Sequence, residues 1–395
     1  VIRELQAKTE IEYQQILGKN QDALKDLEKA LAEKLGLWAH PAASVKLEWQ
    51  KDSKKSVQIE QPTARTIAGE GGFEGDLARL GHGFQRSYLL ALLQVLASSG
   101  GGQEVPRLLL GCEEPELYQH PPQARHLAYV FAQLSSQDAQ IIVSTHNPAF
   151  VTGKGFESVR LVRFDGTVNA SKCRQLTFDD VANRLADVKG EKPLKPAGVQ
   201  AKLHQVLQPG LNELFFTQNL VLVEGLEDVS LITSWMVLTD RWNEFRQKGI
   251  HIVPVNGKSY LAQPLVIAEG LGIPVFTVFD ADGKDTKHQD SHKKDNEILL
   301  GLLGGDSSKP FPNDILWGPR YVVWPESFTE VIKKEIPADK LQTYENKANA
   351  VYGNAGGLGK NGLHIGAKLQ LAFDDGIRPP SLDKLCDAIL VAAKA

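Results

Sequence analysis

The stretch "GIPVFTVFDADGKD", residues 272–285, ends an apolar run in two aspartates, Asp280 and Asp282, with one residue between them. Residues at i and i+2 of a strand point to the same side, so both carboxylates face one small volume, where they repel each other. Because Asp and Gly are common turn formers, a solvated turn is one interpretation. The other is a divalent metal site, because hard cations take oxygen ligands.

A second stretch, "NLVLVEGLEDVSLITSWM" (219–236), favours the metal interpretation. An apolar strand delivers Glu224, Gly225 permits a tight turn, and the helix that follows carries Asp228. Another strand, turn and helix, "HIVPVNGKSYL", separates this unit from the aspartate pair. In a parallel sheet, ligands gather beyond the carboxyl ends of the strands. We therefore predict that Glu224, Asp228, Asp280 and Asp282 form one cluster, which needs a cation because four close carboxylates repel strongly.

The first half of the chain contains three further pieces that belong together: "LGHGFQRS" (80–87), "RLLLGCEEPELYQHP" (107–121) and "QIIVSTHNPAFV" (140–151). The last two each begin with a strand, and a helix-compatible stretch lies between them, which indicates a parallel α/β unit. The first offers two glycines at a helix N-terminus, which suits phosphate binding. The residues singled out in these pieces are Gly81, Gly83, Glu113, Glu114 and His146.

In this order the three pieces resemble the signature loop, the Walker B strand and the switch histidine of ABC-type ATPases, in the branch that includes the overcoming-lysogenization-defect (OLD) proteins. The resemblance implies that Glu113 lies on the metal side, Glu114 is the catalytic base and His146 senses the γ-phosphate. Glu113 stands where the family has Asp, the signature serine is replaced, and no G-x-x-x-x-G-K-[ST] occurs. The chain starts too late for that loop, so we expect ATP to bind only to a longer protein.

The second half looks like a Toprim domain, and with the ATPase pieces the resemblance to the OLD family covers about residues 80–395. It implies a Mg²⁺- or Mn²⁺-dependent DNA endonuclease that uses two ions for phosphodiester hydrolysis. The "EGLED" spacing and a long insertion near 284–315 lean toward the subclass that includes the Gabija phage-defence nuclease. By this resemblance Glu224, Asp280 and Lys368 are catalytic, with Lys360 as the alternative lysine.

A later strand, "YVVWPESFTEVI" (321–332), supplies the remaining candidate ligands Glu326, Ser327 and Glu330. The resemblance favours Glu330 as the later metal ligand, with Glu326 as its rival. Lys258, Lys284 and Lys360 are candidate DNA contacts. Lys284 opens a run that also holds His288 and His292, for which a plain solvated loop is the preferred interpretation.

The composition is that of an ordinary soluble protein of 395 residues with a net charge of −4, 42% hydrophobic residues and three scattered cysteines. No run of about 18 apolar residues and no leader is visible, so we expect a cytoplasmic protein. The predicted organisation is α/β: a helical arm at 1–40, part of an ABC-type ATPase at 41–186, a linker at 187–210 and a Toprim domain at 211–395. The arm is either a homodimer contact, since its apolar face has no obvious partner in the rest of the chain, or a plain pair of surface helices.

Two other functions remain open at this level. One is a non-catalytic DNA-clamping ATPase with a vestigial Toprim domain, and the other is an RNA-processing Toprim nuclease. A helicase partner is compatible with the family resemblance.

Overall fold

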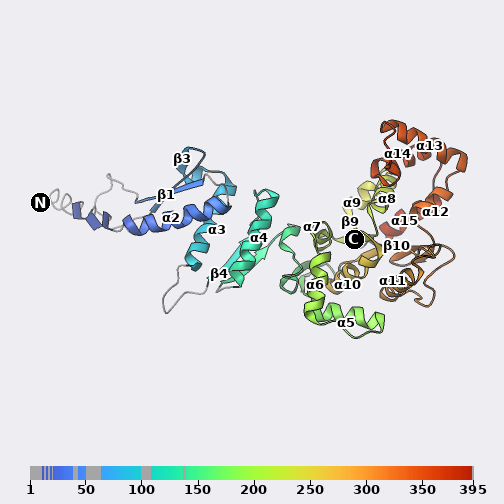
Figure 1. Ribbon diagram of the computed structural model, residues 1–395, viewed down its shortest axis with the longest axis horizontal. Helices are drawn as coiled ribbons and strands as arrows, with labels where there is room; N and C mark the ends of the chain where they lie inside the picture. Colours follow the sequence, from blue (N-terminus) through green and yellow to red (C-terminus); the bar gives the residue numbers. More distant parts are fainter. Residues whose placement is uncertain are drawn as a thin grey trace. The chain divides into compact units, whose positions relative to one another are not determined.

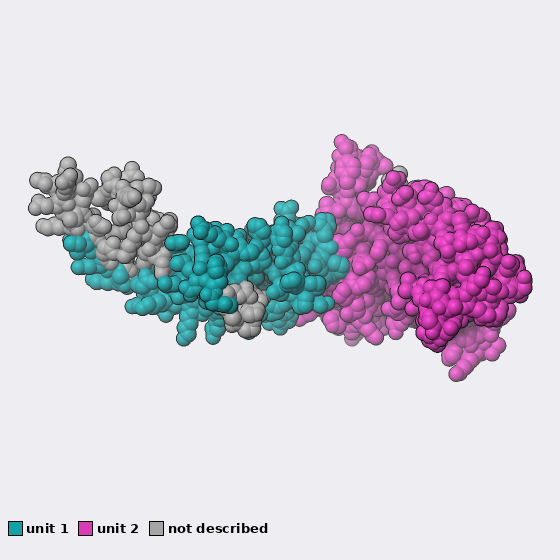
Figure 2. All heavy atoms as spheres, turned by 90° about the horizontal axis from the view of Figure 1, so that it is seen from above, with its two compact units in different colours: residues 1–150 teal, residues 151–395 magenta. Residues whose placement is uncertain are grey.

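The computed structural model describes residues 11, 12, 15, 16, 18, 19, 21–38, 43–49, 64–98, 108–136 and 139–393. The chain divides into two compact units, residues 1–150 and 151–395, which Figure 2 shows in teal and magenta. Both units mix helices and strands, and a parallel sheet is present, so the predicted α/β class is confirmed. Among the helices that the structure describes, none combines the length and the apolar character that crossing a membrane requires.

The first unit contains a short antiparallel sheet in the order β1-β2-β3 and the parallel pair β4-β5 (Figure 1). The pair is joined through α4, which confirms the predicted strand, helix and strand. The elements are α2 (Gln21–Trp38), β1 (Ala43–Trp49), β2 (Ala64–Glu70), β3 (Phe73–Asp76), α3 (His82–Ser98), β4 (Leu108–Glu113), α4 (Pro121–Ser135) and β5 (Ala139–Ser144).

The predicted helical arm, residues 1–40, is described mainly through α2, and its residues 1–10 lie outside the described part. Leu24, Leu31 and Leu35 of α2 are buried in one core with β1 and α3. The expectation that this apolar face lacks a partner within the chain is therefore wrong, because the face packs inside the first unit. A homodimer built through the arm stays a prediction, and the apolar face of α2 does not support it.

The second unit is built on a five-stranded sheet in the order β11-β12-β10-β8-β9, in which only β11 is antiparallel to its neighbour. The strands are β6 (Leu161–Asp165), β7 (Ala170–Arg174), β8 (Asn219–Val223), β9 (Ile250–Pro254), β10 (Val275–Asp280), β11 (Leu316–Gly318) and β12 (Tyr321–Trp324). The helices are α5 (Phe178–Lys189), α6 (Pro196–Val206), α7 (Pro209–Asn212), α8 (Leu226–Leu238), α9 (Trp242–Gln247), α10 (Ala262–Leu271), α11 (Gln289–Leu303), α12 (Phe328–Lys334), α13 (Ala338–Val351), α14 (Gly362–Asp374) and α15 (Pro380–Ala392).

The central strands are buried on both faces, as is typical of parallel sheets. Leu220 and Leu222 of β8 belong to a core shared with α5, α6, α10 and α11, and Val221 and Val223 belong to a second core with α8, α14 and α15. The chain leaves β8 toward β9 on one side and returns to β10 on the other. The carboxyl ends of β8 and β10 therefore meet at the switch point of the sheet, where α/β proteins bind their ligands.

The segment predicted to be a linker, residues 187–210, is folded into the second unit. Val199 and Leu203 of α6 are buried in the same core as Val181 of α5. Two of its prolines, Pro196 and Pro209, are the first residues of α6 and α7. Proline is favoured at that helical position because its fixed φ suits the helix and its missing N–H is not needed there. The division at residue 150 thus lies well before the predicted boundary.

Candidate functional site

Glu224 and Asp228 lie at the junction of β8 and α8. Glu224 directly follows the buried strand, and Gly225 caps the helix in an extended conformation. The Asp228 carboxylate accepts a hydrogen bond from the Gly225 N–H at 3.0 Å, and its side chain is buried in the first turn. A negative charge is favoured at this end of a helix. Both predicted acids therefore face the carboxyl edge of the sheet.

Asp280, the last residue of β10, connects three elements at this edge. Its backbone N–H donates to Glu224 Oε1 at 2.7 Å, and its own Oδ1 accepts from the Phe328 N–H at 2.9 Å. Phe328 is the first residue of α12. The structure thus brings Glu224 and Asp280 together from strands 56 residues apart in the chain, and it holds the Asp280 carboxylate against the start of the later helix.

The electrostatics of these acids are unusual. Burial raises the pKa of Glu224 to about 7 and that of Asp228 to about 6, and the neighbouring carboxylates add to both effects. Burial, followed by repulsion from Glu224, Asp228 and Asp282, raises the pKa of Asp280 well above its ordinary value. Clustered oxygen donors that are hard to ionise match the chemistry of Mg²⁺ and Mn²⁺ sites. A bound divalent ion offsets both the cost of burying the carboxylates and the repulsion between them.

Asp282 differs from the other three because a buried cation already balances its charge. Lys258 Nζ lies 2.7 Å from Asp282 Oδ2 and donates to the Asp280 carbonyl oxygen at 2.6 Å. Only 6% of Lys258 is exposed, so this position does not support the predicted contact with DNA phosphates. Asp282 itself has a φ of 54°, a left-handed conformation that Asp tolerates better than most residues.

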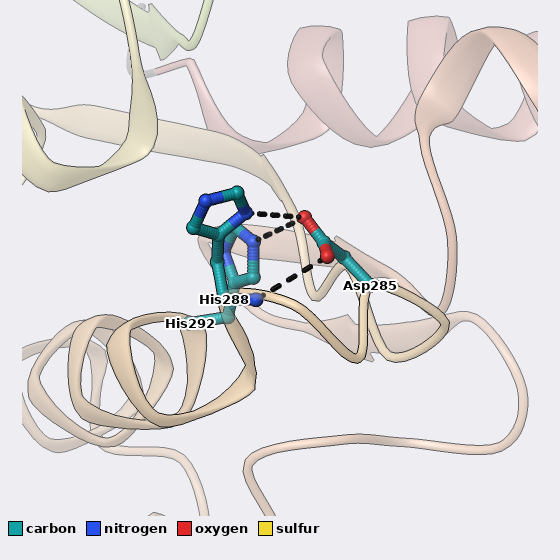
Figure 3. Close-up of side chains that lie close together, drawn as sticks. All are labelled: Asp285, His288 and His292. Carbon is teal, nitrogen blue, oxygen red and sulfur yellow. Dashed lines mark hydrogen bonds and ion pairs between the residues drawn. The ribbon is translucent and has the colours of Figure 1, made fainter.

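The four acids share one sheet edge but do not converge on one point. Among the residues that the structure describes, the group of three metal-ligating side chains within 4.8 Å of one another is Asp285, His288 and His292, shown in Figure 3. Sequence reasoning left the two histidines in a solvated run, although their spacing of four residues before an apolar helix was a usable signal.

The later candidates lie around the start of α12. Ser327 caps this helix, and its hydroxyl accepts from the Glu330 N–H at 3.3 Å. Glu330 pairs with Lys333 at 2.7 Å and is half exposed. Glu326 pairs with both Lys284 and Lys334, which lower its pKa, and it is the more enclosed of the two glutamates. The choice between Glu326 and Glu330 as a ligand stays open.

The candidate Lys368 lies on α14, which packs closely on α8, and Lys360 lies in the turn before that helix. A Cβ added at Gly362 would lie 2.6 Å from Ser230 Oγ, and one at Gly366 would lie 3.1 Å from Ser234 Oγ, so the two helices meet through glycines. Burial lowers the pKa of Lys368. The carboxylates of Glu345 and of Glu227, in the first turn of α8, partly offset this by raising it. Lys360 is exposed and pairs with Glu227 at 3.2 Å.

In the first unit, the predicted ATPase residues meet at the ends of β4 and β5. His146 Nε2 lies 3.4 Å from Glu114 Oε1, and the Glu114 carbonyl oxygen accepts from Arg86. Glu116, which was not among the predicted site residues, accepts from the Thr145 hydroxyl at 2.5 Å and from the His146 N–H at 3.3 Å. Glu116 thereby holds the loop that carries the histidine.

The other predicted residues of this unit lie around the same loops. Glu113 is exposed at the end of β4. Gly81 precedes α3, and Gly83 in its first turn comes so close to the Tyr118 carbonyl that an added Cβ would lie 3.0 Å from it. A larger residue at position 83 would therefore press on the loop after Glu114.

Comparison with known proteins gives the following relationships. Residues 1–151 match the family described as AAA ATPase domain, and residues 215–282 match the family described as Overcoming lysogenization defect protein-like, TOPRIM domain. The chain is 24% identical over 331 residues to the Old nuclease of Escherichia phage P2, which covers 81% of this chain and 53% of that protein. It is 27% identical over 209 residues to the OLD nuclease of Thermus scotoductus, which covers 51% of this chain and 35% of that protein.

Among solved structures, the C-terminal region of the Burkholderia pseudomallei OLD protein is 17% identical, with a TM-score of 0.33, and covers 45% of this chain and 100% of that one. The chain spans about half the length of the phage relative and about a third of the Thermus relative.

Proposed function

From an AAA ATPase domain joined to an OLD-like TOPRIM domain in a relative of the Old nucleases, we propose a metal-dependent DNA endonuclease that cleaves phosphodiester bonds by a two-metal mechanism. The observation that supports the proposal best is the set of buried acids Glu224, Asp228 and Asp280 at the switch point of the sheet. Burying three carboxylates close together is costly unless cations bind there.

In this proposal Glu224, Asp228, Asp280 and Asp282 hold two Mg²⁺ or Mn²⁺ ions, with Glu326 or Glu330 and Ser327 at the later position. When bound, such ions activate water and stabilise the leaving oxygen of the phosphodiester. Glu224 and Asp280 orient each other through the hydrogen bond between the Glu224 carboxylate and the Asp280 N–H.

Lys368 supplies positive charge to the phosphate oxygens in the transition state. Its half-buried position favours it over the exposed Lys360 for this role, because a partly desolvated ammonium interacts more strongly with an anion. The proposal also assigns contacts with the DNA backbone to Lys284 and Lys360, because backbone contact calls for positive charge rather than base-specific groups.

The Glu114 and His146 pair supports a nucleotide-responsive role for the first unit in a longer protein that binds ATP. A homodimer, a helicase partner, a cytoplasmic location and a role in phage defence belong to the same proposal and rest on the family resemblance alone.

The test is plasmid nicking by the purified chain in Mn²⁺, compared with Asp280→Asn. We expect nicking by the parent and its loss, by at least about a hundredfold, in the variant, since the substitution removes a shared ligand. Asp306→Asn is the matched control, because Asp306 is exposed in a surface turn, where its carboxylate contacts Ser308 and Lys309.

Retained nicking by Asp280→Asn would place the active site elsewhere. An intact plasmid with the parent chain would favour the DNA-clamping alternative, and preferential cleavage of structured RNA would favour the RNA-processing one.

A further inference from the structure

A second ligand-rich cluster lies beside the proposed active site, at the start of α11. His288 Nδ1 is 3.1 Å from Asp285 Oδ2, and His292 Nε2 is 3.3 Å from the same oxygen (Figure 3). The other carboxylate oxygen, Oδ1, accepts from the backbone N–H groups of Lys287 and His288 at 2.9 and 3.3 Å. These two bonds fix the carboxylate so that Oδ2 faces both imidazoles.

The separations suit a bound ion. Two donors that each lie about 2.1 Å from a tetrahedral metal ion are about 3.4 Å apart. The two nitrogen-to-oxygen distances are close to this value, and all three ligand atoms lie within 4.8 Å of one another. An ion can therefore enter with small rotations of the three side chains, which come from the turn before α11 and from its first residues.

The histidine nearest the active site also has the support that metal-bound imidazoles usually have. His292 Nδ1 lies 3.3 Å from Asp282 Oδ2, on the side of the ring opposite to Nε2. A proton on Nδ1 that is donated to Asp282 leaves the lone pair of Nε2 for a metal. Such carboxylate–histidine pairs fix the tautomer and strengthen the ligand.

We propose that Asp285, His288 and His292 bind one divalent transition-metal ion, with Zn²⁺ preferred, at a site separate from the proposed catalytic carboxylates. Two imidazoles and one carboxylate select Zn²⁺ over Mg²⁺, which prefers all-oxygen sites. His288 is 58% exposed and Asp285 is 40% exposed at the side chain, so water or a phosphate oxygen can complete the coordination. The positive end of the α11 dipole opposes a cation, and the Asp285 carboxylate offsets this repulsion.

Through His292 the ion would also hold Asp282, one of the proposed catalytic ligands. A metal ion bound here would therefore position the Asp282 carboxylate through His292, without coordinating Asp282 itself.

The test uses the full chain stripped of metal, with excess Mg²⁺ added to occupy the carboxylate cluster, and titrated with Co²⁺ as a spectroscopic probe. We expect one equivalent of Co²⁺ to give visible d–d absorption that Zn²⁺ abolishes. His288→Ala and His292→Ala should lose the band, and Asp282→Asn should weaken Co²⁺ binding by about 10- to 100-fold. His251→Ala is the control, because His251 pairs with Glu213 at 2.6 Å away from this cluster.

Asp280→Asn separates this proposal from the proposed nuclease. If it loses nicking but keeps the Co²⁺ band, the two sites are distinct, as we expect. A band that is absent from the parent chain, unchanged in both histidine variants, or lost in Asp280→Asn would overturn the proposal. Equal melting of the variants and the parent in chelator shows that each variant is folded.

Discussion

At the scale of single residues, burial favours the protonated forms of Glu224, Asp228 and Asp280 when no ion is present. The pKa of Glu224 is raised to about 7 from 4.5, and that of Asp228 to about 6 from 3.8, mainly by burial. An acid with a raised pKa in the folded state contributes stability below its unfolded pKa, and that contribution disappears as pH rises through the folded value.

We therefore expect the free energy of unfolding in chelator to fall as pH rises from about 4 to 7, by on the order of 3 kcal/mol for Glu224 alone. Glu224→Gln should flatten this dependence, because the amide does not ionise. Urea unfolding at several pH values measures it. A parent protein that grows more stable over this range in chelator would contradict the assignment.

Lys258 provides a second prediction at this scale. Replacing it with Met leaves the part-buried Asp282 without the ammonium at 2.7 Å, and losing one partner of such a pair costs up to about 3–5 kcal/mol. Lys284→Met is the matched control, because Lys284 is exposed where it pairs with Glu326, and such pairs contribute at most about 1 kcal/mol. Urea unfolding without metal compares the two, and similar losses would refute a special role for Lys258.

At the scale of elements, the contact between α8 and α14 positions Lys368. Gly362 and Gly366 let α14 approach the serines of α8. A larger residue at Gly362 must either push the helices apart or displace the Ser230 hydroxyl from the Leu226 carbonyl oxygen, to which it donates at 2.8 Å. The lysine is carried two residues beyond Gly366, on the same helix.

We expect Gly362→Val to destabilise the chain by about 1–3 kcal/mol through overpacking and to lower nicking further than stability alone explains. Gly198→Val is the control, since an added Cβ at this helical glycine meets nothing within 4 Å. Thermal melting and plasmid nicking measured on both variants separate packing from helix propensity. Equal effects of the two substitutions would argue against close packing.

At the scale of the whole molecule, the second unit includes segments that precede the TOPRIM match. Val151 and Phe156 belong to the same core as the helices α5 and α6. The buried Asn212 side chain donates to the Val151 carbonyl oxygen at 2.7 Å.

A chain of residues 151–395 should therefore unfold cooperatively, and a chain of residues 187–395 should be much less stable, because it lacks Phe156, Phe178 and Val181 from that core. Calorimetry of the two truncated chains measures the difference. Equal unfolding transitions of the two truncated chains would instead support a domain boundary within residues 187–210, where the prolines suggested it.

The sequence predicted the parts of the site that depend on local pattern. An apolar run that ends in acids marks the carboxyl end of a buried strand, and this located Glu224 and Asp280. The sequence pattern did not predict features that depend on the whole fold. Two of these are the hydrogen bond from the Phe328 N–H to the Asp280 carboxylate and the burial of Lys258. Pro196 and Pro209 misled because proline starts a helix as readily as it interrupts one.

The Lys258 ammonium balances charge at the sheet edge even when no metal ion is bound. A tethered ammonium beside Asp282 and the Asp280 carbonyl acts as a resident counter-ion, so the sheet edge can form before any metal arrives. In the proposed metal-binding role, an incoming ion would exchange with a group that stays attached to the protein, and Lys258 would return when the ion leaves. The edge would then never have to carry its full negative charge between loading events.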